Sequence, residues 1–311
     1  MDLRSLCLAA SVAVAASPTA GQDGARFVAR SDLVVLHVTV TDRRGAYVGG
    51  LSRDSFRVFE NGEERRLNFF LDRDLPATVG LILDSSGSMF AMRHHVATAV
   101  ATFAAASHAD DEFFAMTFNE RVKRAMPPRQ PFTSDPSLVR DAVTDNLGAR
   151  GRTALFDAVS TGLDEVARGH RERQILILIS DGGDNASTTT VEHVFDRAQR
   201  SNAVIYAVAL VDPLVRDRNP KLLRQLATAT GGLAFEPRDA RGIGEALNRI
   251  ARDIRSSYTL AYVPSGTAES DRWRRIRVET RSLNGRRVNV RTRTGYVATT
   301  DPQPQSETGE R

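Results

Sequence analysis

The chain has 311 residues, of which 41% are hydrophobic and 26% are charged, and its formal net charge is +4 at pH 7. This composition is ordinary for a globular protein and excludes wholesale disorder, and the length suffices for one large domain or a domain with a satellite. Arginine supplies almost all of the positive charge, since Lys123 and Lys221 are the only lysines, and we interpret it as a solvated surface.

The first 20 residues, 1–20, predict a signal peptide for export. Arg4 supplies one positive charge, an apolar run covers Leu6–Ala16, and small residues continue to Ala20. The run is too short to cross a bilayer, so we expect cleavage between Ala15 and Ala20, a mature chain without an integral membrane segment, and a periplasmic or extracellular location. Cys7 is the only cysteine and lies inside this signal, so the mature chain would contain no disulfide.

Residues 26–75 are predicted to form a β segment. Apolar and polar side chains alternate over Val34–Thr41, which is the period of a strand. Asn61-Gly62 follows the strand-like stretch Phe56–Glu60. Because both positions of a tight hairpin turn need positive φ, this dipeptide predicts a hairpin that returns through Arg66–Phe70.

Residues 77–256 change to an alternation of strands and helices. Unbroken apolar runs predict buried strands, and apolar stripes at helical spacing predict the helices between them. The expected strands are 79–83, 113–118, 175–179, 204–211 and 233–235, and the expected helices are 96–103, 138–147, 155–166, 191–198, 222–226 and 243–254. This order predicts an α/β fold with a doubly wound, mostly parallel sheet, covered by helices on both faces and joined by right-handed connections.

Residues 257–299 return to the period of strands, and Asn284-Gly285 predicts a second hairpin. An isolated hairpin is marginal in water, so we expect this segment to pair with the N-terminal β segment in one small flanking β subdomain. Residues 300–311 are polar with prolines and are predicted to be a disordered tail. The strand-like stretches are 258–263, 275–279 and 288–292.

Three polar stretches are placed where a chain can offer oxygen atoms in a cleft. Asp84-Ser85-Ser86-Gly87-Ser88 directly follows the apolar run 79–83, and Asp181 directly follows the run 175–179. Thr153 opens one of the predicted helices. In an open α/β sheet, ligands bind beyond the carboxyl ends of the strands, where the strand order reverses, so we expect the three stretches to converge there.

The oxygen donors in these stretches predict a metal site. They contain no histidine or cysteine, which selects a hard cation: Mg²⁺, with Mn²⁺ or Ca²⁺ as alternatives. Two carboxylates and three hydroxyls leave the ion electrophilic, with a coordination position open for an acidic side chain of a partner protein. The predicted ligands are Asp84, Ser86, Ser88, Thr153 and Asp181.

These motifs resemble the von Willebrand factor type A (VWA) family, and the resemblance covers Ala77–Ser256. In that family the five matching positions form the metal-ion-dependent adhesion site, which usually holds Mg²⁺ or Mn²⁺. The resemblance therefore implies a complete site here, a VWA fold and binding of a protein partner. The flanking stretches 51–58 and 257–262 look like those of exported bacterial relatives of unassigned role.

We therefore expect a divalent-metal-dependent protein-binding or adhesion module without catalytic activity. One alternative is a haloacid-dehalogenase-like phosphotransferase with Asp84 as its nucleophile. That chemistry needs a second acid where Ser86 stands and a lysine between the motifs, where only Lys123 is available. A second alternative is a structural envelope protein whose metal site is unused.

Other chemistries and a nucleic-acid partner lack their sequence signals. Gly148–Thr153 has no lysine for a phosphate loop, and no serine lies in a Gly-x-Ser-x-Gly motif. His94 and His95 lack the spacing of a metalloprotease site, and they are interpreted, with His37, as surface residues. The arginines of 272–293 have few aromatic neighbours, which favours a solvated face over a nucleic-acid interface.

Overall fold

Three β-sheets form the framework of the chain. The computed structural model describes residues 33–148, 150–210, 218–264, 273–280 and 287–298. The predicted export signal with Cys7, the Asn284-Gly285 turn and the polar tail lie outside these residues. One sheet has six strands and the other two have four each, and strands from both ends of the chain pair with one another. The predicted fold class is therefore confirmed.

The six-stranded sheet has the strand order β10-β9-β8-β5-β6-β7. All neighbours are parallel except β7, a short edge strand that the sequence did not predict and that pairs antiparallel with β6. Every residue of β5 is buried, as expected for a strand with helices over both faces. The strands are β5 (Ala77–Asp84), β6 (Glu112–Phe118), β7 (Val122–Arg124), β8 (Arg173–Ser180), β9 (Val204–Ala209) and β10 (Ala234–Phe235).

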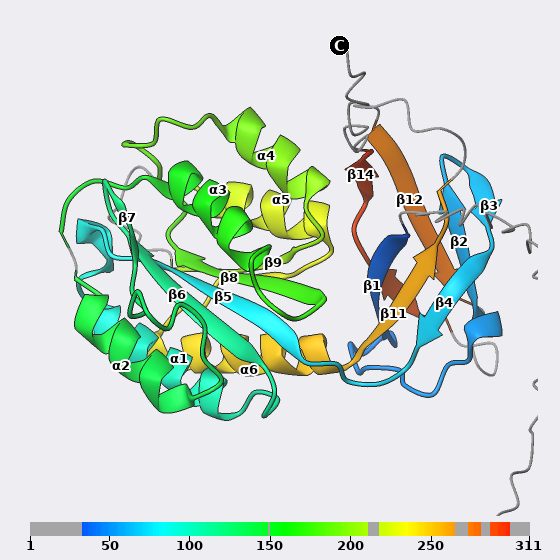
Figure 1. Cartoon of the computed structure of the whole chain (residues 1–311), viewed down its shortest axis with the longest axis horizontal. Helices are drawn as coiled ribbons and strands as arrows, with labels where there is room; N and C mark the ends of the chain where they lie inside the picture. Colours follow the sequence, from blue (N-terminus) through cyan, green and yellow to red (C-terminus); the bar gives the residue numbers. More distant parts are fainter. Residues whose placement is uncertain (1–32, 149, 211–217, 265–272, 281–286, 299–311) are drawn as a thin grey trace, which may run out of the picture. The chain divides into compact units, whose positions relative to one another are not determined.

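Helices cover both faces of this sheet. Figure 1 shows α3, α4 and α5 on one face and α1, α2 and α6 on the other. α5 ends where the sequence predicts, at Gly231, whose φ of +88° is left-handed. None of the described helices is both long enough and apolar enough to cross a membrane. The helices are α1 (Arg93–Ala105), α2 (Pro136–Asn146), α3 (Leu155–Val166), α4 (Val191–Arg200), α5 (Pro220–Thr230) and α6 (Ala240–Arg255).

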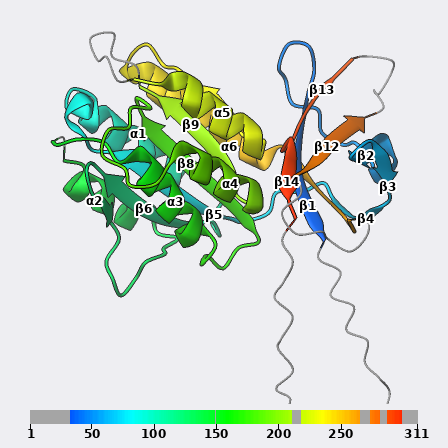
Figure 2. The same cartoon turned by 90° about the horizontal axis from the view of Figure 1, so that it is seen from above.

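The two four-stranded sheets combine strands from before and after the six-stranded sheet (Figure 2). Their orders are β13-β1-β11-β4 and β14-β12-β2-β3, and their apolar faces enclose a second core around Leu36, Val58 and Leu260. The strands are β1 (Val34–Thr41), β2 (Phe56–Glu60), β3 (Glu63–Arg65), β4 (Leu67–Leu71), β11 (Ser257–Tyr262), β12 (Trp273–Thr280), β13 (Asn289–Arg291) and β14 (Gly295–Val297).

The pairing predicted for the two hairpins is wrong. Asn61 and Gly62 do form a turn with φ of +52° and +92°, but β3 is the strand that returns along β2. The predicted return strand Arg66–Phe70 corresponds to β4, which pairs with β11 in the other sheet. Near the C-terminus, β12 pairs with β2 and β14, and β13 pairs with β1. A local turn signal specifies a reversal of the chain, whereas the partner of a strand depends on which apolar faces are buried together.

His37 does not have the surface position that its strand period suggested. Its ring is half-buried in β1, and its Nδ1 is enclosed without a hydrogen-bond partner among the described residues. Burial, with the positive charges of Arg173 and Arg293 nearby, lowers the pKa of His37 to about 3. His94 and His95 are exposed, as predicted.

A buried carboxylate joins the smaller sheets to the six-stranded sheet. Asp253 of α6 is 1% exposed and accepts hydrogen bonds from the hydroxyls of Tyr206 in β9 (2.7 Å) and Tyr47 (3.2 Å). Arg291 of β13 forms an ion pair with the same carboxylate. Since a buried ion pair needs several hydrogen bonds to offset its desolvation, the convergence of three donors explains why Asp253 is tolerated there.

Gly80 in the centre of β5 tests the packing of the strand that ends at Asp84. A Cβ atom at this position would lie 2.2 Å from Cζ of Phe114 and 2.6 Å from Cδ2 of Leu176, both of which are buried. We expect Gly80→Ala to lower the free energy of unfolding by about 1–3 kcal/mol through overpacking. Gly244→Ala in α6 is the control, because nothing lies within 4 Å of its Cβ position, and helix propensity predicts a gain of about 0.5–1 kcal/mol. Urea denaturation measures both, and equal effects would contradict this account of the core.

Candidate metal centre

The candidate site lies at the carboxyl ends of two neighbouring strands. β5 and β8 pair in parallel register with Leu83 opposite Ile179, so Asp84 and Asp181 follow at nearly the same level. β6 lies on the other side of β5, so the strand order reverses between β5 and β8. This is the position at which open α/β sheets bind ligands, and the two predicted carboxylates are both there.

Asp84 is a buried carboxylate held by neutral donors. It is 1% exposed; its Oδ1 accepts from the backbone N–H of Ser86 at 2.9 Å and its Oδ2 accepts from the hydroxyl of Ser180 at 2.7 Å. Burial raises the pKa of Asp84 to about 6, and the negative charge of Asp181 adds to the rise while the serine hydrogen bonds oppose it. Among the described residues, no arginine, lysine or histidine forms an ion pair with this carboxylate.

Ser86 and Ser88 present adjacent hydroxyl groups. Their Oγ atoms are 3.1 Å apart, and Ser88 lies within a short 3₁₀ turn, Gly87–Met89, that precedes α1. The N–H of Gly87 donates to the carbonyl of Gly151 at 3.3 Å. The loop after β5 is therefore bonded directly to the loop that precedes Thr153.

Thr153 is fixed through its backbone, which leaves its hydroxyl available. It is buried, its N–H donates to Oδ1 of Asn185 at 2.9 Å, and its carbonyl accepts from the N–H of Asn185 at 2.9 Å. Its hydroxyl makes no hydrogen bond with any residue in the described part of the chain. This pair of hydrogen bonds ties the loop before α3 to the loop after β8.

Asp181 is held in a similar way at the end of β8. Its Oδ1 accepts from the N–H of Gly183 at 2.9 Å, and its carbonyl accepts from the N–H of Asn219 at 3.1 Å. Gly182, between Asp181 and Gly183, has a φ of +83°, and a Cβ atom at this position would lie 2.4 Å from the carbonyl oxygen of Asn219. Oδ2 of Asp181 accepts no hydrogen bond from a described residue. The tight turn therefore leaves this oxygen free to accept a cation.

The five predicted residues fit a hard divalent cation by their chemistry. All the donors are oxygens, and Thr153 Oγ1 and Asp181 Oδ2 have no partner among the described residues. Two buried carboxylates without a described cationic partner are electrostatically costly, and a bound ion would offset that cost. Within the described ranges no three His, Cys, Asp or Glu side chains form a metal-binding group, so hydroxyls would have to complete the coordination.

The von Willebrand factor type A domain model matches residues 79–249, which is more than half of the chain. The chain belongs to this family. The match begins within β5 and ends within α6, and it includes all three loops of the candidate site. No curated protein shows significant sequence similarity to the chain.

Similar solved structures come from bacteria and from the mussel byssus. A von Willebrand factor type A protein from Catenulispora acidiphila is 15% identical, covers 88% of this chain and 76% of its own, and gives a TM-score of 0.48. An aerotolerance-related membrane protein from Bacteroides fragilis is 14% identical, with coverage of 57% and 98% and a TM-score of 0.47. Proximal thread matrix protein 1 from the mussel byssus, with a zinc-occupied MIDAS motif, is 17% identical, with coverage of 58% and 48% and a TM-score of 0.44. At these values the similarity carries no conclusion about function.

Two residues that support the site were not assigned a role from the sequence. Ser180 is completely buried and bonds Asp84, and Asn119 accepts from the N–H of Ala154 at 2.7 Å and donates to the carbonyl of Arg150 at 3.1 Å. The sequence does contain a signal for Ser180, because a polar residue there ends an apolar strand. It contains no signal for Asn119, because the contacts of Asn119 join loops that are distant in the sequence. Asn185 also supports the site, because its Oδ1 accepts from the N–H of the predicted ligand Thr153.

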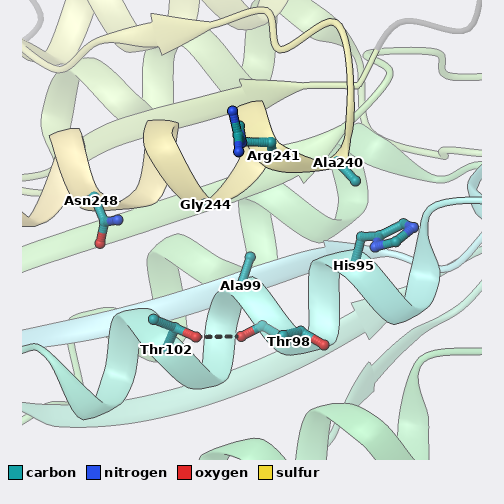
Figure 3. Close-up of a pocket in the computed structure, with 8 residues that line it drawn as sticks. All are labelled: His95, Thr98, Ala99, Thr102, Ala240, Arg241, Gly244 and Asn248. Atoms are coloured by element: carbon teal, nitrogen blue, oxygen red, sulfur yellow. Dashed lines mark hydrogen bonds between the residues drawn. The ribbon is translucent and has the colours of Figure 1, made fainter.

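A groove between α1 and α6 lies apart from this site. Figure 3 shows the residues that line it, and its volume is about 340 Å³. The only hydrogen bond drawn there runs along α1, from the Thr102 hydroxyl to the carbonyl of Thr98 at 3.0 Å. The lining consists of small and polar side chains, including His95, Thr98, Thr102, Arg241, Gly244 and Asn248, and offers no carboxylate for a metal.

The buried charge of Asp84 predicts a pH-dependent stability of the VWA domain without metal. The pKa of Asp84 is higher in the folded than in the unfolded chain, so ionisation destabilises the fold as the pH rises from about 4 to about 6. In EDTA at neutral pH we expect Asp84→Asn to raise the free energy of unfolding by about 2–3 kcal/mol, and we expect the gain to shrink towards pH 4. Urea titrations at the two pH values measure it.

The exposed Asp141, paired with Arg140 on α2, provides the control. Asp141→Asn should change the stability by less than about 0.5 kcal/mol at both pH values. A destabilised Asp84→Asn at neutral pH would contradict the view that this carboxylate is uncompensated without metal.

Proposed function

We propose that the VWA domain is a divalent-metal-dependent protein-binding module. Asp84, Ser86, Ser88, Thr153 and Asp181 would hold Mg²⁺, with Mn²⁺ or Ca²⁺ as alternatives. The observation that carries the proposal is the buried Asp84 carboxylate, which has only neutral hydrogen-bond donors among the described residues and the charge of Asp181 beside it. VWA domains are usually non-catalytic binding modules, which agrees with this chemistry.

The proposed partner contact is an acidic side chain that completes the coordination of the ion. Asp84 and Asp181 would balance the charge of a divalent cation, and the hydroxyls add donors without adding charge. Such an ion remains electrophilic and accepts a further carboxylate readily. The chain's own residues would bind and orient the ion, and the partner's acid would occupy the position that remains.

A phosphotransferase receives less support from the same residues. Both oxygens of Asp84 already accept hydrogen bonds, and Ser86, where that chemistry needs a second acid, pairs with Ser88. Lys123 is exposed on β7 and makes no ion pair with a described residue. A structural protein with an unused site explains the fold, but it does not explain an uncompensated buried carboxylate.

We also propose that the protein is exported, with residues 1–20 as its signal and a periplasmic or extracellular destination. The support is the sequence alone: a short apolar run behind one positive charge, followed by small residues. The domain limits that we propose are 26–75 and 257–299 for the paired β segments, 77–256 for the VWA domain and 300–311 for the tail.

Metal binding is tested by thermal unfolding of the full chain. We expect Mg²⁺ or Mn²⁺ to raise the melting temperature of the wild type, with about 2.7 kcal/mol of stabilisation at a hundred times the dissociation constant. Asp84→Ala and Asp181→Ala should remove the shift while circular dichroism shows that both remain folded. Asp141→Ala should keep it. No shift in the wild type would favour the structural alternative.

Partner binding is tested by capture from an envelope extract with and without EDTA, followed by reconstitution with the purified partner. We expect the wild type to bind in Mg²⁺, and we expect Asp84→Ala or EDTA to reduce binding by at least about a hundredfold, since the coordinated carboxylate would be lost. Capture that is unchanged in EDTA would refute the proposal. Mg²⁺-dependent hydrolysis of a small phosphoester, lost in Asp84→Asn, would establish the phosphotransferase instead.

A further inference from the structure

Two exposed arginines lie directly against the proposed metal loop. The N–H of Arg150 donates to the carbonyl of Ser85 at 3.0 Å, and Arg152 immediately precedes the proposed ligand Thr153. Both side chains are exposed, and neither guanidinium forms a hydrogen bond or an ion pair with a described residue. The backbone of these arginines holds the loops together, whereas the two guanidinium groups make no contact with a described residue that would stabilise the loops.

Elsewhere in the described chain, exposed arginines are of two kinds. Arg57, Arg124 and Arg140 pair with Glu64, Glu165 and Asp141, whereas others, such as Arg66 and Arg241, have no acidic partner among the described residues. Arg121, on the loop that Asn119 ties to Arg150, also has a guanidinium without a described partner. Three guanidinium groups without a partner among the described residues therefore lie on the loops around this site.

The acidic residues nearby, Glu120 and Asp184, offset only part of these three positive charges. Glu120 is exposed, and its Oε2 accepts from the backbone N–H of Arg152 at 3.0 Å. Asp184 is engaged by the hydroxyl of Ser187 at 2.5 Å and by the N–H of Phe156 at 3.3 Å. With a divalent ion balancing the two buried aspartates, the rim of the site would carry a net positive charge.

An exposed aromatic residue adjoins the same loop. Phe90 is 60% exposed, the highest value among the large hydrophobic residues of the described chain, and its N–H donates to the carbonyl of Gly87 at 3.3 Å. The guanidinium of Arg93 lies 4.0 Å from the centre of its ring. Phenylalanine and arginine are both enriched at protein interfaces relative to the rest of the protein surface.

We propose that the partner of this site is an acid-rich protein segment rather than a single isolated acid. One carboxylate of the segment would complete the metal, further carboxylates would pair with Arg150 and Arg152, and an apolar side chain next to the first carboxylate would contact Phe90. This inference rests on the proposed metal-dependent binding and adds the composition of the partner to it. A nucleic acid fits less well, because single strands are held by several stacking aromatics, and Phe90 is the one exposed aromatic among the described residues of these loops.

The arginines should mainly increase the rate of association with an acidic partner and the discrimination between acidic and neutral partners. Rim charges accelerate association with a partner of opposite charge, and they lose this effect as the salt concentration rises. They should contribute little to the affinity for the metal itself, since they are exposed and are not ligands.

The test uses the full-length mature chain in Mg²⁺ and fluorescent peptides of equal length. One peptide carries a single aspartate and a leucine in a neutral background, and the other carries three additional acids. We expect the wild type to bind the acid-rich peptide about tenfold more tightly, and we expect Arg150→Ala/Arg152→Ala to lose that preference. Phe90→Ala should weaken binding of leucine-containing peptides relative to peptides with serine in place of the leucine.

A matched control carries the same loss of charge away from the site. Arg73 and Arg129 are exposed, and neither guanidinium has a partner among the described residues. Arg73 lies in the segment that leads to the amino end of β5, and Arg129 lies between β7 and α2, in the segment that pairs with the amino end of β6. Arg73→Ala/Arg129→Ala should keep the preference. The Mn²⁺ dissociation constant should be unchanged within about twofold in both double variants. This measurement distinguishes an effect of the arginines on the peptide from an effect on metal binding.

Equal affinity of the wild type for the two peptides, or an equal loss of preference in both double variants, would overturn the inference while leaving metal-dependent binding intact. Binding of both peptides that persists in EDTA would instead overturn the proposed function on which the inference rests. An oligonucleotide that binds in Mg²⁺ more tightly than the acid-rich peptide would overturn the protein class of the partner.

Discussion

The site depends on one electrostatic constraint, the burial of the Asp84 carboxylate at the end of the central strand. Asp84 receives hydrogen bonds from Ser86 and Ser180 but has no positive partner among the described residues, and Asp181 adds a second negative charge. A fold keeps such an arrangement only if something compensates it, because an unpaired buried charge is among the most costly features of a protein. A divalent cation is the compensation that the surrounding oxygen atoms can hold.

The fold brings the proposed metal ligands close to Asp84. β5 and β8 place their carboxyl ends side by side, and backbone hydrogen bonds join the loops after β5, before α3 and after β8. The arginine-bearing loop is bonded into the same cluster through Arg150 and Ser85. The same few hydrogen bonds between loops therefore position both the exposed arginines and the proposed metal ligands.

The sequence predicted the parts of this arrangement that are encoded locally. Unbroken apolar runs identified β5 and β8, and the polar residues directly after them identified Asp84 and Asp181. It could not predict the partners of strands in the flanking sheets, because β4 and β13 pair with strands that are distant in the sequence. For the same reason the half-burial of His37 and the loop contacts of Asn119 were not visible in any local period.

The most direct test of the account is the position of a bound ion. Crystals grown with Mn²⁺ should show one strong anomalous peak within coordination distance, about 2.0–2.4 Å, of oxygens from Asp84, Ser86 and Ser88, with Thr153 and Asp181 reached directly or through water. A well-ordered crystal in excess Mn²⁺ with these five side chains ordered and no anomalous density between them would contradict the central claim.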